Sequence, residues 1–307
     1  MTFNTTPTFQ SLDGLYEPSA IVQLKDGRFL VVEDEKEHPF SLLTIKPDGQ
    51  TGSVSLTPGL FESADGFWKV GDLEGLTLDP TGWIYAITSQ SLDSEGEAKK
   101  SREKLVRFRV EGDRVRKAKS VNGLKSALVA AHPVLAAAAG VRAAKSTGGL
   151  NVEALEISAD GQHLWVGFRS PLLDGQALVA RIDNPAAIFD DDEAPRIAPS
   201  LTMLDLGGHG IRGMSWLPER GAYLVIGGPS ARDGQAFGLW LWSGEAGSPA
   251  RRVHLPGLPG IERAEGVCPA VIDGRACIVI VSDDGDRENG RCARYLVLDP
   301  GALQVDD

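Results

Sequence analysis

Four glutamates and one arginine recur at one place in a repeated pattern of the chain. Each precedes a short apolar run, a turn that contains glycine, and a second apolar run. The five residues are Glu17, Glu74, Glu153, Arg212 and Glu265. Carboxylates that meet in a partly dry place repel one another unless a cation neutralises them. The pattern therefore predicts either a divalent cation, Ca²⁺ or Mg²⁺, held by the four glutamates, or a ring of structural ion pairs completed by Arg212.

The spacing of the repeats predicts the fold. The five charged residues are separated by 57, 79, 59 and 53 residues, and the segments before the first and after the last together make 58. The two ends therefore supply one repeat between them, as a closed ring requires. Each repeat reads as four strands, and radial repetition of four-stranded sheets is a β-propeller. We predict one all-β domain over residues 1–307, a five-bladed β-propeller closed by the N-terminal strand. Six blades would require one unrecognised repeat.

The one long interval has a local explanation. It exceeds its neighbours by about 22 residues, and the Ala-rich segment 124–145, which has this length, lies inside it. Strong helix formers such as alanine favour a helix here, so we predict one helical insertion near residues 124–145.

Three further residues are candidates for chemistry at the channel mouth. In a propeller blade the first strand lines the channel and the second returns beside it, so the start of one and the end of the other open on the same face. Arg169 and Arg102 could reach over this mouth and bind an anionic part of a substrate. His209 lies three residues before Arg212 and could act as an acid or base. The alternatives are a solvated loop for Arg102 and an ordinary loop histidine for His209.

Composition and charge exclude several classes of protein. With 31 basic and 42 acidic residues the net charge is −11, which disfavours nucleic-acid binding. There is no stretch of about 20 apolar residues to span a membrane, and the first seven residues contain no export signal. We therefore expect a cytoplasmic protein, or a periplasmic one if a leader has been removed. The three cysteines, Cys268, Cys277 and Cys292, are too few for a disulfide scaffold, although one bridge is possible.

Several short motifs resemble those of one bacterial propeller family, the domain of unknown function 3616. They are Leu73-Glu74-Gly75-Leu76, Phe168-Arg169-Ser170-Pro171, Ile211-Arg212-Gly213-Met214 and Ala264-Glu265-Gly266-Val267. More distantly, the chain is similar to the propellers described by the esterase-like activity of phytase and to calcium-dependent lactonase and phosphotriesterase propellers. The first resemblance implies the fold, and the distant ones imply metal-assisted hydrolysis at the channel mouth. The lactonase type uses Asn and Asp ligands beside Glu, whereas here Glu predominates and one position is Arg.

Two functions follow as predictions. The first is a metal-dependent hydrolase of a small ester, lactone or phosphoester. Glu74, Glu153 and Glu265 would hold the cation with help from Glu17, while Arg212, Arg169 and Arg102 would fix an anionic part of the substrate. The second is a non-catalytic propeller that binds a small molecule or a protein partner at the same mouth, with a structural Glu/Arg ring.

Overall fold

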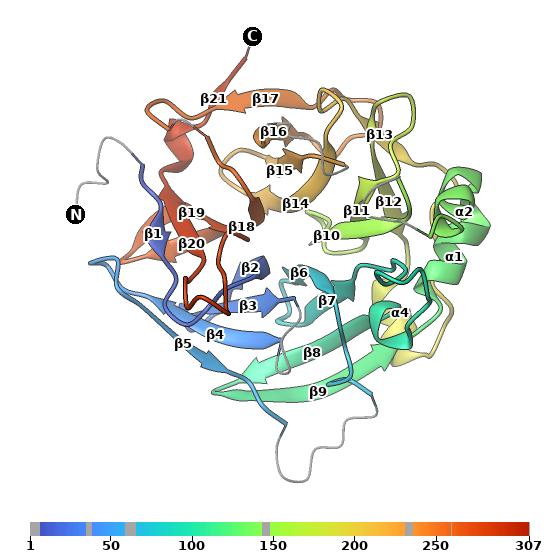
Figure 1. The fold of residues 1–307 in the computed structure, drawn as a ribbon, viewed down its shortest axis with the longest axis horizontal. Helices are drawn as coiled ribbons and strands as arrows, with labels where there is room; N and C mark the ends of the chain where they lie inside the picture. The colour runs from blue at the N-terminus through green and yellow to red at the C-terminus, as the bar shows by residue number, and fades with distance from the viewer. Residues whose placement is uncertain are drawn as a thin grey trace.

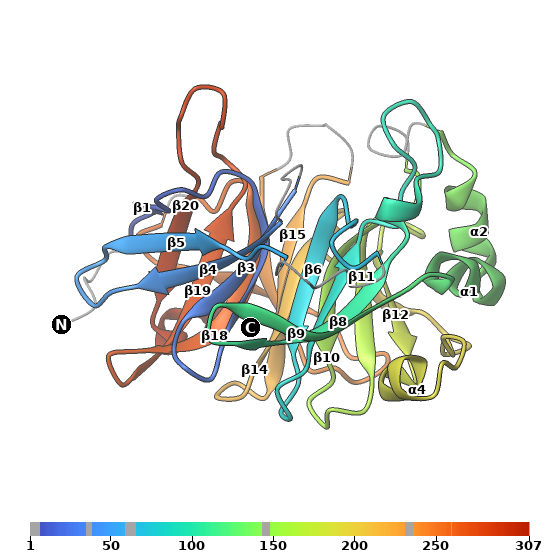
Figure 2. The same cartoon turned by 90° about the horizontal axis from the view of Figure 1, so that it is seen from below.

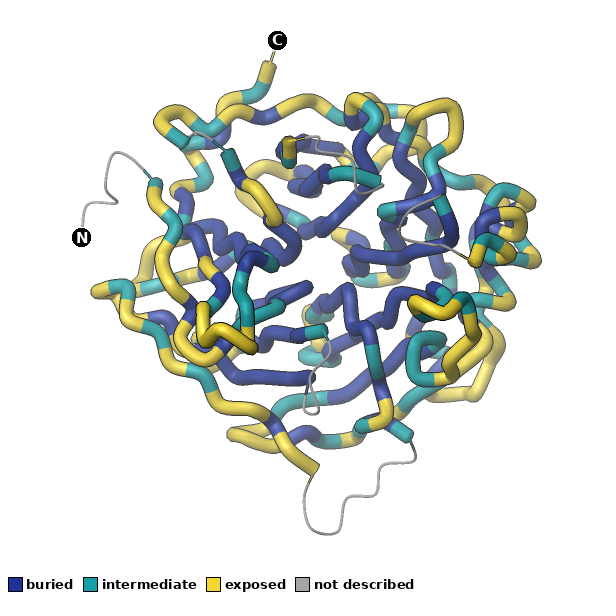
Figure 3. Tube along the Cα trace, viewed as in Figure 1, coloured by how far each residue is buried: buried dark blue, intermediate teal, exposed yellow. Residues whose placement is uncertain are grey.

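Five antiparallel sheets stand around a central axis as the blades of a β-propeller (Figure 1). The computed structural model describes residues 7–34, 39–58, 66–142, 148–230, 236–258 and 260–306. The innermost strands of the blades surround the channel and are buried along most of their length (Figure 3). The predicted all-β propeller with five blades is thus confirmed.

The blades follow one another around the ring in chain order. Blade 1 contains β2 (Pro18–Gln23), β3 (Phe29–Glu33), β4 (Phe40–Ile45) and β5 (Thr51–Ser55). Blade 2 contains β6 (Leu73–Leu78), β7 (Ile84–Thr88), β8 (Leu105–Glu111) and β9 (Arg114–Val121). Blade 3 contains β10 (Asn151–Ile157), β11 (Leu164–Ser170), β12 (Ala177–Ile182) and β13 (Thr202–Leu204). Blade 4 contains β14 (Gly210–Leu217), β15 (Ala222–Gly228), β16 (Gly238–Trp242), β17 (Arg251–His254) and β21 (Gln304–Val305). Blade 5 contains β18 (Ala264–Ile272), β19 (Arg275–Ser282), β20 (Arg294–Leu298) and β1 (Gln10–Ser11).

The N-terminal strand closes the ring, as predicted. β1 pairs antiparallel with β20, with Gln10 opposite Tyr295 and Ser11 opposite Arg294. The hydroxyl of Tyr295 lies 2.9 Å from Oε1 of Gln10 and 2.9 Å from the carbonyl oxygen of Gly49 in blade 1. The closing strand therefore links blade 5 to the blade that follows it in the ring. β21 adds a fifth strand to blade 4, which the repeat pattern did not predict.

The predicted helical insertion is present but is divided into two helices. α1 (Leu124–Ala131) ends before His132, whose backbone is extended, and α2 (Pro133–Ala139) begins at the next residue. A proline is tolerated in the first turn of a helix but cannot continue one, so Pro133 separates the two. Their buried leucines pack in the core between blades 2 and 3. Residues 143–147 of the predicted stretch lie outside the described part of the chain.

Three other short elements lie in connections between strands. They are α4 (Pro185–Asp190) and the 3₁₀ turns η1 (Lys100–Arg102) and η2 (Pro300–Ala302). All three cysteines are unpaired, so the possible bridge is not formed. Among the described residues, no helix has the length and apolar character needed to cross a membrane.

A buried carboxyl group joins blades 3 and 4 away from the channel mouth. Glu156 of β10 accepts a hydrogen bond from the backbone N–H of Trp216 at 2.9 Å, and Ser215 Oγ lies 3.5 Å from the same oxygen. Burial raises the pKa of Glu156 to about 8, against the hydrogen bonds that lower it. In the folded protein Glu156 therefore keeps its proton at pH values where the unfolded chain has lost it.

This raised pKa predicts that Glu156 reduces stability as the pH rises from about 4.5 to about 8. Glu156→Gln keeps the shape and an acceptor but cannot ionise. We expect the variant to match the wild type at pH 5 and to be more stable by at least about 1 kcal/mol at pH 9. Urea unfolding at the two pH values measures this difference. Glu219→Gln, at an exposed position, should follow the wild type at both, and equal pH dependence of all three proteins would contradict the assignment.

Candidate functional site

Each innermost strand carries a β-bulge near its start, and the bulges align around the ring. The register shifts between Pro18 and Ala20 in β2, and the equivalent shift recurs in β6, β10, β14 and β18. The residues skipped by the pairing are Ser19, Glu74, Glu153, Arg212 and Glu265. A bulge leaves its extra residue outside the ladder and re-aims the side chain. Four of the five predicted positions are therefore equivalent by register.

The register corrects the predicted position in blade 1. Ser19, and not Glu17, occupies the place in β2 that corresponds to Glu74 in β6. Glu17 corresponds instead to Asp72, because each lies two residues before the bulge and accepts a backbone hydrogen bond from the residue after the second strand. The charge pattern selected Glu17 because the true equivalent is an uncharged serine. The structure does not place Glu17 in a group with Glu74.

A second ring of residues lies at the end of the second strand of each blade or directly after it. Counted from the same ladder positions, its members are Asp34, Ser89, Arg169, Gly228 and Asp283. The backbone N–H of Asp34 donates to Glu17, that of Ser89 to Asp72, and that of Asp283 to Arg263. These bonds place the second ring beside the first at the same end of the channel. Residues 35–38, which include His38 and follow Asp34 in the chain, lie outside the described residues.

One half of the mouth is an ion-pair chain across three blades. Arg212 lies between Glu153 and Glu265, and all three side chains are more than nine-tenths buried. Its Nη2 donates to Oε1 of Glu265. Its Nε lies 2.8 Å from Oε2 of Glu153, an ion-pair distance, although the N–H is not aligned for a hydrogen bond. Glu153 also binds Arg169 at 3.0 Å and accepts a hydrogen bond from Asn151 at 2.7 Å. For these glutamates the structure shows the arrangement of the second prediction, structural ion pairs.

Burial and charge act in opposite directions on this chain. Burial alone would lower the pKa of Arg212, but the carboxylates of Glu153 and Glu265 outweigh it and raise that pKa above its ordinary range. Burial raises the pKa of Glu265 to about 8, and Arg212 opposes this rise. Arg212 is thus a permanent charge that keeps two buried carboxyl groups from being left without compensation.

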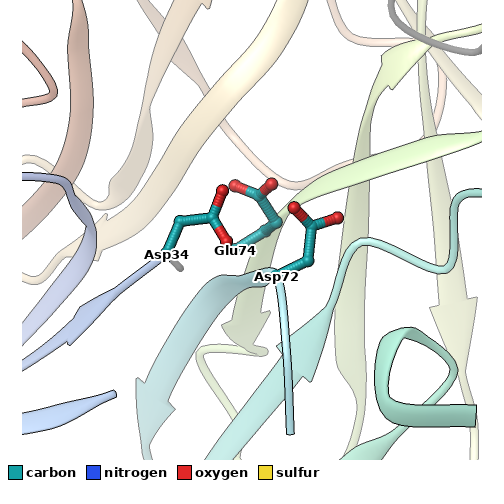
Figure 4. A group of neighbouring side chains, drawn as sticks. All are labelled: Asp34, Asp72 and Glu74. Atoms are coloured by element: carbon teal, nitrogen blue, oxygen red, sulfur yellow. The ribbon is translucent and has the colours of Figure 1, made fainter. Parts of the chain in front are cut away.

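The other half of the mouth gathers three carboxylates from blades 1 and 2. Asp34, Asp72 and Glu74 bring one oxygen each within 4.8 Å of one another, and their carboxyl groups lie near one another in Figure 4. Glu74 is 6% exposed. Its carboxylate forms no hydrogen bond or ion pair with any residue in the described part of the chain. Burial, followed by the charges of Asp72 and Glu153, raises the pKa of Glu74 well above its ordinary range.

Arg102 and Arg169 both reach the mouth, and both are engaged with carboxylates there. Arg102, in η1, donates from Nη2 to Asp72 Oδ2 and lies 3.2 Å from Ser91 Oγ. Arg169 binds Glu153 and donates from Nε to the carbonyl oxygen of Pro229 at 3.1 Å. These contacts give each arginine a positioning task within the mouth, in addition to any contact with substrate.

His209 is held by the backbone on both sides of its ring. Nδ1 lies 2.6 Å from the carbonyl oxygen of Leu206, and Nε2 lies 2.8 Å from that of Ala236. The imidazole is 8% exposed and also packs against Trp240 at 5.4 Å between ring centroids. In this arrangement both ring nitrogens are engaged by backbone carbonyl oxygens next to blade 4. The acid–base role of His209 stays a prediction.

Sequence reasoning did not single out Asp34 and Asp72. Asp34 follows the second apolar run of the first repeat, and Asp72 stands two residues before Glu74. Asp34 shares its residue type with only one of its counterparts, Asp283, and Asp72 shares its type with none. Strand register, and not charge, identifies both residues. Each occupies a position beside the bulge that recurs in the paired strands of every blade.

The channel beside these residues is narrow. Glu74, Glu153 and Glu265 line a cavity of about 10 Å³ between the innermost strands, which is roughly the room that one water molecule needs. A single ion or water fits there, so an organic substrate would have to lie above it. A second group of carboxylates, Asp93, Glu95 and Glu97, lies in a surface loop, where Lys99 contacts two of them.

Solved structures with a similar fold have low identity to this chain. The calcium structure of a Trichoderma reesei protein of Carbohydrate-Active Enzymes Family AA12 is 10% identical, with a TM-score of 0.47, covering 97% of this chain and 98% of that one. The Malassezia sympodialis allergen Mala s 1 is 12% identical, with a TM-score of 0.46, covering 93% and 80%. The PQQ domain of a Coprinopsis cinerea pyranose dehydrogenase is 10% identical, with a TM-score of 0.45, covering 91% and 82%. Likenesses at this level say nothing of activity, and a search of curated proteins found no significant match.

A family model gives the more informative comparison. The model described as "Esterase-like activity of phytase" matches residues 10–236. This range begins at the closing strand β1 and runs through blades 1 to 3 into blade 4, so it includes Asp34, Asp72 and Glu74. Because the match covers more than two thirds of the chain, this propeller belongs to the phytase-like family named for that esterase-like activity.

Proposed function

We propose that the protein is a hydrolase of a small ester, lactone or phosphoester that uses a divalent cation held by Asp34, Asp72 and Glu74. The observation that carries the proposal is the environment of Glu74. This residue is 6% exposed, its carboxylate has no partner among the described residues, and it lies against two aspartates. A buried carboxyl group in such a place must either keep a proton or receive a cation.

The donor set fits a hard cation. Carboxylate oxygens are the ligands that Ca²⁺ and Mg²⁺ prefer in proteins, and the group contains neither sulfur nor imidazole. The oxygens converge from two blades, so their spacing is fixed by the packing of β3 against β6 rather than by one loop. This set differs from the four glutamates predicted from the sequence, since Glu153 and Glu265 are paired with Arg212.

The chemistry divides between the two halves of the mouth. When bound, a divalent cation would polarise the scissile group and lower the pKa of a bound water. Arg102 orients Asp72, while Arg212 compensates the charges of Glu153 and Glu265. The esterase-like description of the family supports hydrolysis. Relation to the domain of unknown function 3616 and to the lactonase propellers, like the choice of Ca²⁺ or Mg²⁺, stays a prediction.

A thermal-shift titration tests the cation. Chelator-treated protein is titrated separately with Ca²⁺, Mg²⁺, Mn²⁺ and Zn²⁺, because an ion that binds only the folded state raises stability with the logarithm of its concentration. We expect a saturable rise with one metal in the wild type and no rise in Glu74→Gln. The metal-free variant should be at least as stable as the wild type, since it removes repulsion.

Glu95→Gln, in the exposed carboxylate group of the surface loop, is the matched control and should keep the rise. Turnover of p-nitrophenyl acetate, γ-butyrolactone and p-nitrophenyl phosphate is then measured with the active metal. If no metal stabilises the wild type, or if Glu74→Gln responds as the wild type does, the proposed site is wrong.

The second function remains a distinct outcome of the same experiment. A non-catalytic propeller would bind the cation, or a small molecule, at this mouth without turning over any ester. The ion-pair chain through Arg212 supports this alternative, because it engages Glu153 and Glu265 of the predicted ring in ion pairs. A metal-dependent rise in stability without turnover would support it. The net charge of −11 still disfavours a nucleic-acid partner.

A further inference from the structure

Hydrolysis at this mouth needs a group that can take and return a proton, and most ionisable groups there are already engaged. Glu153 and Glu265 share Arg212. Asp72 binds Arg102, and His209 contacts two backbone carbonyls. In addition, Glu33 binds Arg287 and accepts hydrogen bonds from the backbone N–H of Tyr16 and the hydroxyl of Ser41. Asp284 binds Arg294 and accepts a hydrogen bond from the hydroxyl of Ser282. Each of these groups already has a partner within the structure.

Apart from Glu74 of the proposed cation group, Asp283 is the exception among the described residues at the mouth. It follows the last residue of β19, and its backbone N–H donates to Arg263 at 2.8 Å. Its carboxylate forms no hydrogen bond or ion pair with a described residue, and its side chain is only partly exposed. In Figure 2 the connection from β19 to β20, drawn in red, rises above one face of the ring. Asp283 stands at its base.

The position of Asp283 in its blade is the one that Asp34 has in blade 1. Both residues follow the second strand, and both donate their backbone N–H to the residue two before the bulge. Blades 5 and 1 are neighbours through the ring closure. Two equivalent aspartates therefore border the same mouth, one in the proposed cation group and one outside it.

The charges around Asp283 favour reversible protonation. Burial raises the pKa of Asp283, Arg212 of β14 and Arg263 before β18 oppose this, and Glu153 of β10 and the adjacent Asp284 add to it. Glu265 of β18 faces the same group, since its own pKa is raised by Asp283. A carboxyl group whose pKa moves toward neutrality is better suited to proton transfer than an ordinary aspartate.

We infer that Asp283 is the general base of the proposed hydrolase. Its carboxylate accepts a proton from the attacking water as the water oxygen forms a bond to the acyl or phosphoryl centre. It then returns that proton to the leaving oxygen as the old bond breaks, which regenerates the carboxylate and releases an acid and an alcohol. This role rests on the proposed function and does not involve binding of the cation.

The test compares Asp283→Asn with Glu74→Gln and with Glu288→Gln, an exposed acid in the same connection. With the active metal and the best ester, Asp283→Asn is expected to lower kcat by about 100-fold or more, while its metal-dependent thermal shift stays that of the wild type. The wild-type kcat should rise with pH across the ionisation of Asp283, and this limb should be lost in the variant. Asp283→Glu should restore part of the activity, and Glu288→Gln should be unchanged.

A measurement without metal or substrate separates the inference from a purely structural role. Because burial raises the pKa of Asp283 in the folded state, the wild type should lose stability relative to Asp283→Asn as the pH rises above the ordinary aspartate range. A kcat within threefold of the wild type in Asp283→Asn, with the wild type active, would overturn the base and leave the hydrolase standing. No turnover by the wild type with any metal would overturn both.

Discussion

Replacing Arg212 by methionine is expected to lower the free energy of unfolding by about 3–5 kcal/mol at pH 8. The change leaves Glu153 and Glu265 buried side by side without the guanidinium that both contact. Removing one partner of a buried ion pair costs this much because the remaining charge loses its counter-ion and gains no water. Glu153 keeps its contact with Arg169, so the cost falls mainly on Glu265. Urea unfolding of the metal-free protein measures the loss.

The pH dependence of this loss identifies its cause. At low pH Glu265 of Arg212→Met can take up a proton, so the variant should recover part of its stability relative to the wild type as the pH falls. The triple variant Arg212→Met, Glu153→Gln, Glu265→Gln should also recover stability at pH 8. Arg196→Gln breaks an exposed pair with Glu193 and should cost no more than about 1 kcal/mol. A loss in Arg212→Met that neither low pH nor the triple variant relieves would show that packing, and not charge, is responsible.

Gly213→Ala is expected to be the most damaging replacement of a single small residue at the mouth. A Cβ on Gly213 would stand 1.9 Å from the carbonyl oxygen of Glu265 in the next blade. The contact is with backbone on both sides, so no rotamer change relieves it, and blades 4 and 5 must separate. We expect a loss of about 3 kcal/mol or more in the free energy of unfolding. The site of Arg212 should be disturbed as well.

The matched control is Gly52→Ala. Gly52 lies in the outer strand β5, and a Cβ there meets nothing within 4 Å. This replacement should be neutral or slightly stabilising, because alanine restricts the unfolded chain more than glycine does. Circular dichroism during thermal unfolding measures both variants. A midpoint of thermal unfolding of Gly213→Ala within a degree or two of the wild type would contradict the close approach of blades 4 and 5 at this residue.

The ring could be predicted because its repeats share chain lengths and turn residues. The similar intervals between the charged residues predict the number of blades. The segments before the first and after the last charged residue together make one interval, which predicts the closure by β1. The composition of segment 124–145 also predicts the helical insertion. It does not predict that Pro133 divides the insertion into two helices. β21 has only two paired residues, Gln304 and Val305, and a pattern that short carries no signal.

The pairing of charges at the mouth could not be predicted in the same way. Sequence places Glu74, Glu153, Arg212 and Glu265 on one ring, but the distances across the channel decide which glutamates Arg212 reaches. No residue type marks the position of the bulge. The charge pattern therefore predicts Glu17 in blade 1, although Ser19 occupies the equivalent position. The places of Asp34 and Asp72 at the mouth depend on the strand register of blades 1 and 2. The repeat pattern alone does not give that register.

The closing strand has a consequence for how the chain reaches its folded state. Gln10 must find Tyr295 across 285 residues, and contacts so distant in sequence carry the largest loop-closure entropy and form slowly. During synthesis the segment that becomes β1 leaves the ribosome before any of the blades, whereas its partner strand β20 emerges only after blades 1 to 3 and the first four strands of blade 4. Until β20 emerges, β1 has no strand to pair with, and the growing ring keeps an open sheet edge.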